Sequence, residues 1–254
     1  MRREWMKVIE HKSIARDTYQ LILKGELVEE VDEPGKFVHI QINPEFFLRR
    51  PLSIADVDFH EQTLTLLYKV MGKGTDALTE KRVGDQLDVL GPGGRGFPVA
   101  SLESDHALII GGGIGVPPLY YLAKNLVERG IKVTSVLGFR SEADVFYEDE
   151  FRELGEVTVV TNDGSYGEKG FVTDVLPNLD PPIDTYFSCG PGVMLKAVTE
   201  QLPQLPGYIS MEERMGCGIG ACFACVVPTP DSDEKGYRRI CCDGPVFKAE
   251  EVVL

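Results

Sequence analysis

Residues 108–119 read Leu-Ile-Ile-Gly-Gly-Gly-Ile-Gly-Val-Pro-Pro-Leu, and this stretch decides the fold of the central part of the chain. It begins as a short apolar run typical of a buried strand, and apolar residues at helical spacing follow from Leu119 to Leu126. Glycines between a strand and a helix let bare backbone approach a pyrophosphate, whose charge a helix N-terminus stabilises. A tight strand–helix connection without a ligand is the alternative interpretation. The stretch predicts a nucleotide-binding turn with candidate contacts at Gly111, Gly113, Gly115 and Pro118.

The sequence after Ser101 alternates between strand-like and helix-like segments. The strand-like segments are 108–110, 133–137, 157–161 and 185–188, and the helix-like ones are 119–126, 148–154 and 193–202. Such alternation predicts a parallel doubly wound sheet, whose ligand crevice lies at the carboxyl ends of the strands. Cys189-Gly190-Pro191 directly follows one of these strands. We therefore expect Cys189 at a nicotinamide wall, with a small buried core side chain as the alternative.

The first hundred residues have the pattern of antiparallel β-structure. Short apolar segments separated by Gly, Pro and Asp occur at Lys7–Ile9, Thr18–Leu23, Phe37–Ile42, Thr63–Val70 and Gln86–Leu90. Residues 63–66 alternate between threonine and leucine, as a half-buried strand does. A series of such strands predicts a small closed barrel.

Two segments of this barrel are candidates for binding a diphosphate. Arg49-Arg50-Pro51-Leu52-Ser53 places a guanidinium and a hydroxyl at the start of an extended segment. Gly72-Lys73-Gly74-Thr75 opens a short helix that we expect over residues 76–81. A guanidinium together with N-terminal helix amides suits a diphosphate. The alternatives are an ordinary strand end and a capped turn.

Four cysteines near the C-terminus predict a metal centre. Cys217, Cys222 and Cys225 have the C-x4-C-x2-C spacing of plant-type ferredoxins, and Cys241 follows after a hairpin-length interval. The pattern predicts a [2Fe–2S] cluster. A zinc site with four thiolates is the alternative, although zinc favours two paired C-x2-C knuckles and the sequence has one. Spacing alone leaves both Cys241 and Cys242 open as the fourth ligand.

Composition limits the function classes. The 254 residues suffice for two domains and an appendage, and 26 basic against 40 acidic side chains give a net charge of −14, which disfavours nucleic-acid binding. We expect no membrane span and no secretion signal, and hence a cytoplasmic address where thiols stay reduced. The predicted organisation is a β-barrel over 1–100, a nucleotide-binding α/β domain over 101–210 and a [2Fe–2S] module over 211–254; the resemblance described next implies FAD in the first and NAD in the second.

The chain resembles the ferredoxin–NADP reductase superfamily over nearly its whole length. Within it, the chain is most similar to the iron–sulfur electron-transfer subunits of NAD-dependent dihydroorotate dehydrogenases. The resemblance is carried by Arg50-Pro51-Leu52-Ser53, Gly72-Lys73-Gly74-Thr75, the glycine run through Pro118, Thr161 to Gly167, Cys189-Gly190-Pro191, Met211 to Cys225, and Cys241 to Phe247. The cysteine module is the most specific of these, because many relatives share the nucleotide motifs.

This resemblance implies the cofactors and their contacts. It implies FAD in the barrel, NADH on the glycine run with Cys189-Gly190-Pro191, and Cys241 as the fourth cluster ligand. Leu52 stands where the wider superfamily prefers an aromatic residue. The implied FAD contacts are Arg50, Pro51, Leu52, Ser53, Leu67, Tyr68, Lys69, Gly74 and Thr75.

The resemblance also implies a function that needs a partner. Electrons would pass between NADH, FAD and the cluster, and on to an FMN-containing catalytic subunit that oxidises dihydroorotate, in a heterotetramer with two of each subunit. NAD is expected over NADP because Asp163 would repel a 2′-phosphate, although Arg140 could compensate. The alternatives are a subunit of another complex, of the ferredoxin:NADP oxidoreductase or sulfide dehydrogenase type, and a zinc-stabilised binding module without redox cofactors.

Overall fold

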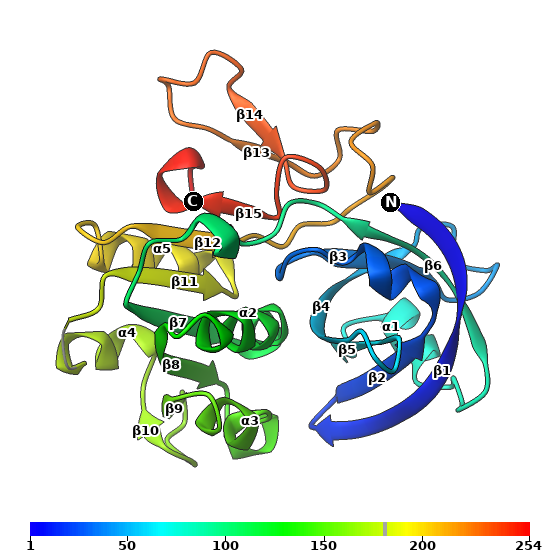
Figure 1. Ribbon diagram of the computed structural model, residues 1–254, viewed down its shortest axis with the longest axis horizontal. Coiled ribbons are helices and arrows are strands. Elements are labelled where there is room, and N and C mark those ends of the chain that lie inside the picture. Colours follow the sequence, from blue (N-terminus) through cyan, green and yellow to red (C-terminus); the bar gives the residue numbers. More distant parts are fainter. Residues whose placement is uncertain (180–181) are drawn as a thin grey trace.

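The computed structural model describes residues 1–179 and 182–254. A β-barrel and a layered α/β body lie side by side, and the C-terminal segment lies along one end of both (Figure 1). Short 3-10 turns occur at Glu26–Glu30, Val99–Ser101, Gly113–Gly115, Glu142–Asp144, Leu176–Asn178 and Ala249–Glu251. This arrangement confirms the predicted fold class, while the exact division at residues 100 and 210 stays a prediction.

The N-terminal strands close into a barrel in the order β1-β2-β5-β4-β3-β6. Its strands are β1 (Arg2–Ala15), β2 (Thr18–Lys24), β3 (Phe37–Gln41), β4 (Arg50–Asp58), β5 (Thr63–Lys69) and β6 (Gln86–Gly93). Alternate residues fill the interior, among them the fully buried Met6, Leu21 and Leu64. Full closure removes exposed strand edges, which stabilises a small barrel against edge pairing.

The short helix α1 (Lys73–Leu78) begins three residues before the predicted 76–81. The Thr75 hydroxyl explains the earlier start, because it accepts the amides of Met71 at 2.9 Å and Gly72 at 3.3 Å. It also donates to the Gly72 carbonyl at 3.1 Å. A side chain that satisfies the first amides of a helix stabilises its first turn.

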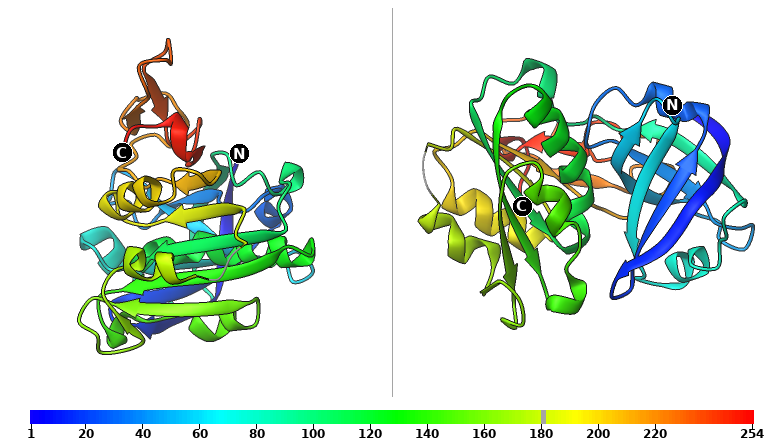
Figure 2. Two further views of the ribbon diagram at one scale, coloured as in Figure 1. Left: turned by 90° about the vertical axis from the view of Figure 1, so that its left-hand side faces the viewer. Right: turned by 60° about the horizontal axis from the view of Figure 1, so that its bottom comes forward.

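The α/β body is built on parallel strands with helices on both faces (Figure 2). The strands are β7 (His106–Gly112), β8 (Lys132–Phe139), β9 (Glu156–Thr161), β10 (Glu168–Lys169), β11 (Thr185–Cys189) and β12 (Gly207–Ser210). The helices are α2 (Val116–Glu128), α3 (Glu148–Arg152), α4 (Val172–Val175) and α5 (Gly192–Gln201). In β7, Ile109 packs toward the cluster that includes α2, and Leu108 and Ile110 pack toward the one that includes α5. Burial on both faces explains why residues 107–110 of this strand are all apolar.

The C-terminal segment contributes a strand that the sequence did not predict. It contains a hairpin of β13 (Val226–Pro228) and β14 (Tyr237–Arg239), followed by β15 (Val246–Lys248). β15 pairs antiparallel with β12, so the sheet order is β10-β9-β8-β7-β11-β12-β15. The sheet is therefore mixed at one edge and not purely parallel. A three-residue strand gives little periodicity, and its role is to cover the edge of β12.

Of the helices that the structure describes, none has the length and apolar character needed to cross a membrane.

A buried carboxylate joins the barrel to the α/β body. The side chain of Asp144 is 6% exposed, and it accepts hydrogen bonds from Lys69 at 3.0 Å, from Ser141 at 2.9 Å and from Arg16. Arg16 and Lys69 belong to the barrel, whereas Ser141 precedes Asp144 in the α/β body. Burial alone would raise the pKa of Asp144, but these hydrogen bonds outweigh it and hold the pKa below its usual value.

We expect Asp144→Asn to lower the free energy of unfolding at pH 7 by about 2 kcal/mol, because two cations lose their buried partner. A carboxyl group whose pKa is lowered in the folded protein stabilises the fold at pH values above its ordinary pKa near 4. This stabilisation is lost as the pH falls through the lowered pKa. The difference in melting temperature between wild type and Asp144→Asn should therefore become smaller below about pH 4. Glu142→Gln, an exposed change two residues away, is the matched control. Equal melting of wild type and Asp144→Asn at pH 7 would contradict this role.

Candidate functional site

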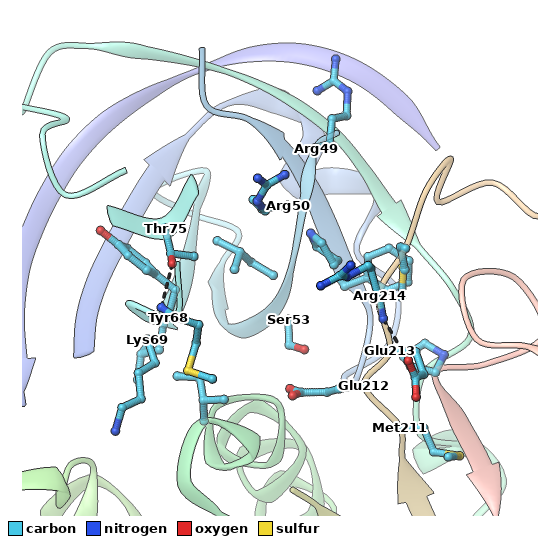
Figure 3. A pocket seen from close by; sticks show the side chains of 18 of the residues that line it. Arg49, Arg50, Ser53, Tyr68, Lys69, Thr75, Met211, Glu212, Glu213 and Arg214 are labelled. Carbon is cyan, nitrogen blue, oxygen red and sulfur yellow. Dashed lines mark hydrogen bonds between the residues drawn. The ribbon is translucent and has the colours of Figure 1, made fainter. Parts of the chain in front are cut away.

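A cavity of about 770 Å³ opens between the barrel and the segment that follows β12. Figure 3 shows side chains from β4, β5 and residues 211–214 arranged around it. The structure brings together here the predicted flavin contacts Arg50, Pro51, Leu52, Ser53, Leu67, Tyr68, Lys69 and Thr75. These residues come from separate strands, so the cavity exists only once the barrel has closed.

Gly74, the remaining predicted flavin contact, has a supporting position behind the cavity. A Cβ atom on Gly74 would lie 2.4 Å from Nε of Arg50, so the guanidinium packs directly on the glycine backbone. Arg50 also donates to the Leu48 carbonyl at 2.5 Å and lies over the Phe46 ring at 5.4 Å. With its remaining N–H groups near the start of α1, it presents positive charge to an anionic ligand.

A second cavity of about 670 Å³ lies at the carboxyl ends of the parallel strands. Gly113 and Pro191 line it among the predicted nucleotide contacts, together with Arg140 and Asn162. Lys69, Met71 and Ile114 line both cavities. The two cavities therefore adjoin, and molecules bound in them would meet at these three residues.

The other predicted nucleotide contacts form the wall behind this cavity. A Cβ atom on Gly115 would lie 2.4 Å from the Cys189 carbonyl oxygen, and one on Gly111 would lie 2.8 Å from Val116 Cγ2. Cys189 is fully buried, and this burial raises the pKa of its thiol well above the usual value. The structure also buries Gly190 and Pro118. The glycines let the turn pack tightly against β11, and the geometry gives Cys189 the small buried position that was its alternative interpretation.

Glu212 is a cavity residue that the sequence reasoning missed. It lines the first cavity, and Figure 3 shows its carboxylate pointing inward just below Ser53. Its side chain is exposed to the open cavity, and the protein atoms packed around the carboxylate raise its pKa to about 7. The available signal was its place just after a strand of the sheet, but β12 itself was not predicted.

The predicted cluster ligands lie in two pairs. The Cys217 sulfur accepts the Cys222 amide at 3.4 Å, and the Cys222 sulfur accepts the Cys217 amide at 3.3 Å. In the second pair, the Cys225 sulfur accepts the Cys241 amide at 3.4 Å. The Gly220 amide joins the pairs, because it lies in the loop of the first and donates to the Cys241 sulfur at 3.1 Å.

This arrangement fits a two-iron cluster. Among the described residues, no three His, Cys, Asp or Glu side chains converge closely enough to hold one metal ion. Two thiolate pairs bridged by backbone amides suit a cluster whose two irons each take two protein ligands. Burial raises the pKa of Cys217, but hydrogen bonds from the Ile219 amide and the Cys222 thiol bring it to about 7. Its thiolate is thus already favoured at neutral pH.

The structure distinguishes Cys241 from Cys242 by their hydrogen bonds. Cys241 is 2% exposed, and it both donates its amide to a ligand sulfur and accepts an amide from the ligand loop. Burial and the neighbouring Cys225 raise the pKa of the Cys241 thiol to about 12, so metal binding there must release a proton. Within the described residues, these amide–sulfur bonds do not reach Cys242, which supports Cys241 as the proposed fourth ligand.

Comparison with known proteins identifies the family. Residues 212–253 match the model of the iron-sulfur cluster binding domain of dihydroorotate dehydrogenase B, and residues 109–200 match the oxidoreductase NAD-binding domain. A relative from Geobacillus sp. (strain WCH70), named "Dihydroorotate dehydrogenase B (NAD(+)), electron transfer subunit", is 53% identical over 257 residues covering 100% of both chains. The chain belongs to this family. The relative of the same name from Shouchella clausii (strain KSM-K16) is 50% identical, covering 98% of this chain and 97% of its own.

Solved structures of other oxidoreductases share the fold. The structure of an NADH-dependent reduced ferredoxin–NADP oxidoreductase is 31% identical with a TM-score of 0.88, covering 98% of this chain and 90% of that chain. The cytochrome b5 reductase domain of Ulva prolifera nitrate reductase has a TM-score of 0.65 at 20% identity, covering 80% of this chain and 93% of its own. The second likeness shows the fold alone.

We expect Cys241→Ser to abolish the visible absorption and iron content of the cluster, because a serine oxygen replaces a buried thiolate. Cys242→Ser is the matched control, since it makes the same change one residue away outside the amide–sulfur network. Iron analysis and visible circular dichroism of the purified variants measure the outcome. Loss of the cluster in Cys242→Ser with retention in Cys241→Ser would reverse the assignment.

Glu212 should make thermal stability depend on pH around neutrality. A raised carboxyl pKa contributes stability that is fully present below the ordinary value near 4 and is lost as the pH rises through about 7. We expect the melting temperature of wild type to fall relative to that of Glu212→Gln between pH 5 and pH 8. Glu213→Gln, which changes the neighbouring and likewise exposed carboxylate, should follow wild type. Parallel pH curves for wild type and Glu212→Gln would rule out the raised pKa.

Proposed function

We propose that this chain passes electrons between NADH, FAD and a [2Fe–2S] cluster, to or from a catalytic subunit that interconverts dihydroorotate and orotate. The observation that carries the proposal is the order of the sites. The nucleotide cavity adjoins the flavin cavity at Lys69, Met71 and Ile114, and Met215 of the flavin cavity lies two residues before Cys217. The three sites thus follow one another in space.

The two cavities suit different cofactors. The first offers the Arg50 guanidinium, the start of α1 and an extended wall along β4 and β5, as a flavin dinucleotide requires. The second offers Gly113 at the carboxyl end of β7, as a nicotinamide dinucleotide requires. When bound, FAD takes two electrons from NADH together as hydride and releases them singly to the cluster, which carries one.

The protein's own residues position these groups. Ser53 and Glu212 both line the flavin cavity, so that a hydroxyl and a carboxylate face its occupant. Lys69 is held by Asp144 at 3.0 Å, which fixes an ammonium group at the junction of the two cavities. The buried helix α2 closes the nucleotide turn from behind and excludes water from that side.

NAD is proposed over NADP because of the loop after β9. Asp163 accepts the Ser165 hydroxyl at 2.6 Å and the Ser165 amide at 3.0 Å. These bonds lower the pKa of Asp163, so its carboxylate stays ionised and repels a 2′-phosphate. Arg140 lines the second cavity, but the carboxylate of Asp144 lines it as well.

The name of the relatives, an electron transfer subunit, implies a catalytic partner. We infer that the partner carries FMN, that two copies of each subunit assemble, and that the complex works in the cytoplasm. The 31% identity to the ferredoxin–NADP oxidoreductase supports the competing reading of a different complex, and the roughly 50% identity to the dihydroorotate dehydrogenase B subunits outweighs it.

Purification of the tagged chain with its partner from the native host tests this function. We expect NADH to bleach the flavin and cluster absorption under anaerobic conditions, in the chain alone and in the complex. Dihydroorotate should bleach the complex and leave the isolated chain unchanged. We also expect kcat/KM for NADPH to be about tenfold or more below that for NADH, since like charges repel at the ribose.

Three results would contradict the proposal, and each concerns a different element of it: the need for a partner, the identity of the complex, or the presence of redox cofactors. Oxidation of dihydroorotate by the isolated chain would remove the need for a partner. A copurifying protein without FMN would favour the other complex. A colourless preparation without flavin or iron would favour the non-redox binding module.

A further inference from the structure

A buried histidine lies between the flavin cavity and the cluster loop. His39 is 1% exposed and belongs to β3, where it pairs in register with Pro51 of β4. Its ring lies 5.4 Å from the ring of Phe37, which is on the same face of the strand. Pro51 and Phe37 both line the flavin cavity, so His39 packs directly behind its wall.

The imidazole of His39 lies against the backbone of the ligand loop. A Cβ atom on Gly218 would lie 2.5 Å from Cε1 and 2.6 Å from Nε2 of His39, and a side chain there would collide with the ring. Gly218 also has a φ of +70°, which favours glycine. Because Gly218 directly follows Cys217, the ring sets how closely this ligand can approach the barrel.

The same ring holds the residue on the other side of that ligand. His39 Nε2 lies 3.4 Å from the sulfur of Met215, so that its N–H donates to the thioether. Met215 is 6% exposed, lines the flavin cavity and precedes Cys217 by two residues. One side chain of the barrel therefore contacts the loop before and after its first ligand.

Stability alone does not explain an imidazole at this position. Nδ1 of His39 is buried and finds no hydrogen-bond partner among the described residues. An unpaired buried nitrogen is destabilising, and a leucine of similar size would remove that cost. Polar contacts to the loop are what the imidazole offers and a leucine does not.

We propose that His39 is a positioning residue for the cluster, which fixes the ligand loop against the flavin barrel through Gly218 and Met215. The inference rests on the proposed function, because it assumes that the loop holds a cluster. Arg239 secures the loop from within the C-terminal segment, donating to the Gly220 carbonyl at 2.9 Å. His39 supplies the corresponding contact from the barrel, so the geometry of the ligand loop depends on the element that builds the flavin cavity.

The test compares His39→Leu with His39→Gln in the full-length protein carrying its cofactors. We expect His39→Leu to melt at or above the temperature of wild type, yet to shift the circular dichroism and the electron paramagnetic resonance spectrum of the reduced cluster. Its rate of iron loss to a chelator should rise about tenfold, as for other changes around metal ligands. His39→Gln, which keeps an N–H donor at similar reach, should restore part of both properties.

Controls separate positioning from general packing and from failure of the proposed function. His106→Leu removes another buried imidazole, in the α/β body, and should leave the cluster spectra unchanged. Met215→Leu removes the sulfur acceptor alone and should shift the spectra in the same direction, which keeps the test available if His39→Leu does not fold. Unchanged spectra and iron loss in both His39→Leu and Met215→Leu would overturn the inference. Absence of iron from wild type would instead refute the proposed function beneath it.

Discussion

The pairing of β12 with β15 is the constraint on which the arrangement of the sites depends. Ser210 pairs with Val246, and the Met211 amide donates to the Pro245 carbonyl at 3.0 Å, so one short ladder holds both ends of the C-terminal segment. The Arg95 amide donates to the Gly244 carbonyl at 2.6 Å and ties the same point to the end of the barrel. The segment between β12 and β15 has more than thirty residues and little regular structure, and these contacts anchor both of its ends to the α/β body and the barrel. Since loop closure costs entropy that grows only slowly with length, anchoring both ends restricts the intervening loop at modest cost.

This anchoring also gives the residues after β12 two roles at once. Residues 210–215 form one wall of the flavin cavity and then lead directly into the first cysteine of the ligand loop. A displacement of the ligand loop would therefore move a wall of the flavin cavity, and a displacement of that wall would move the ligand loop. Interiors are close-packed, so such neighbouring parts move together or not at all. The buried contact between His39 and Gly218 makes that coupling direct.

The parts that the sequence predicted are those with a strong local signal. β7 is apolar on both faces and α2 has helical spacing, so both were predictable without knowledge of the partner elements. β12 and β15 are four and three residues long, and their stability comes from pairing with each other across a long interval of sequence. Local periodicity carries no information about such a pairing. Glu212 was missed for the same reason, because its place at the cavity follows from the end of β12.

The glycines of the run at residues 111–115 belong to one predicted motif, but they have different physical roles at different positions. Gly113 has a φ of +53° and open space where its side chain would be, so it can present its backbone to a ligand. Gly115 and Gly111 are instead needed by packing, because a Cβ atom at either would meet β11 or α2. The sequence pattern is the same in both cases, since glycine satisfies close approach of any kind. Close packing of the turn brings the start of α2 against the carboxyl end of β11, and this is what places the nucleotide cavity beside Lys69 and the flavin barrel.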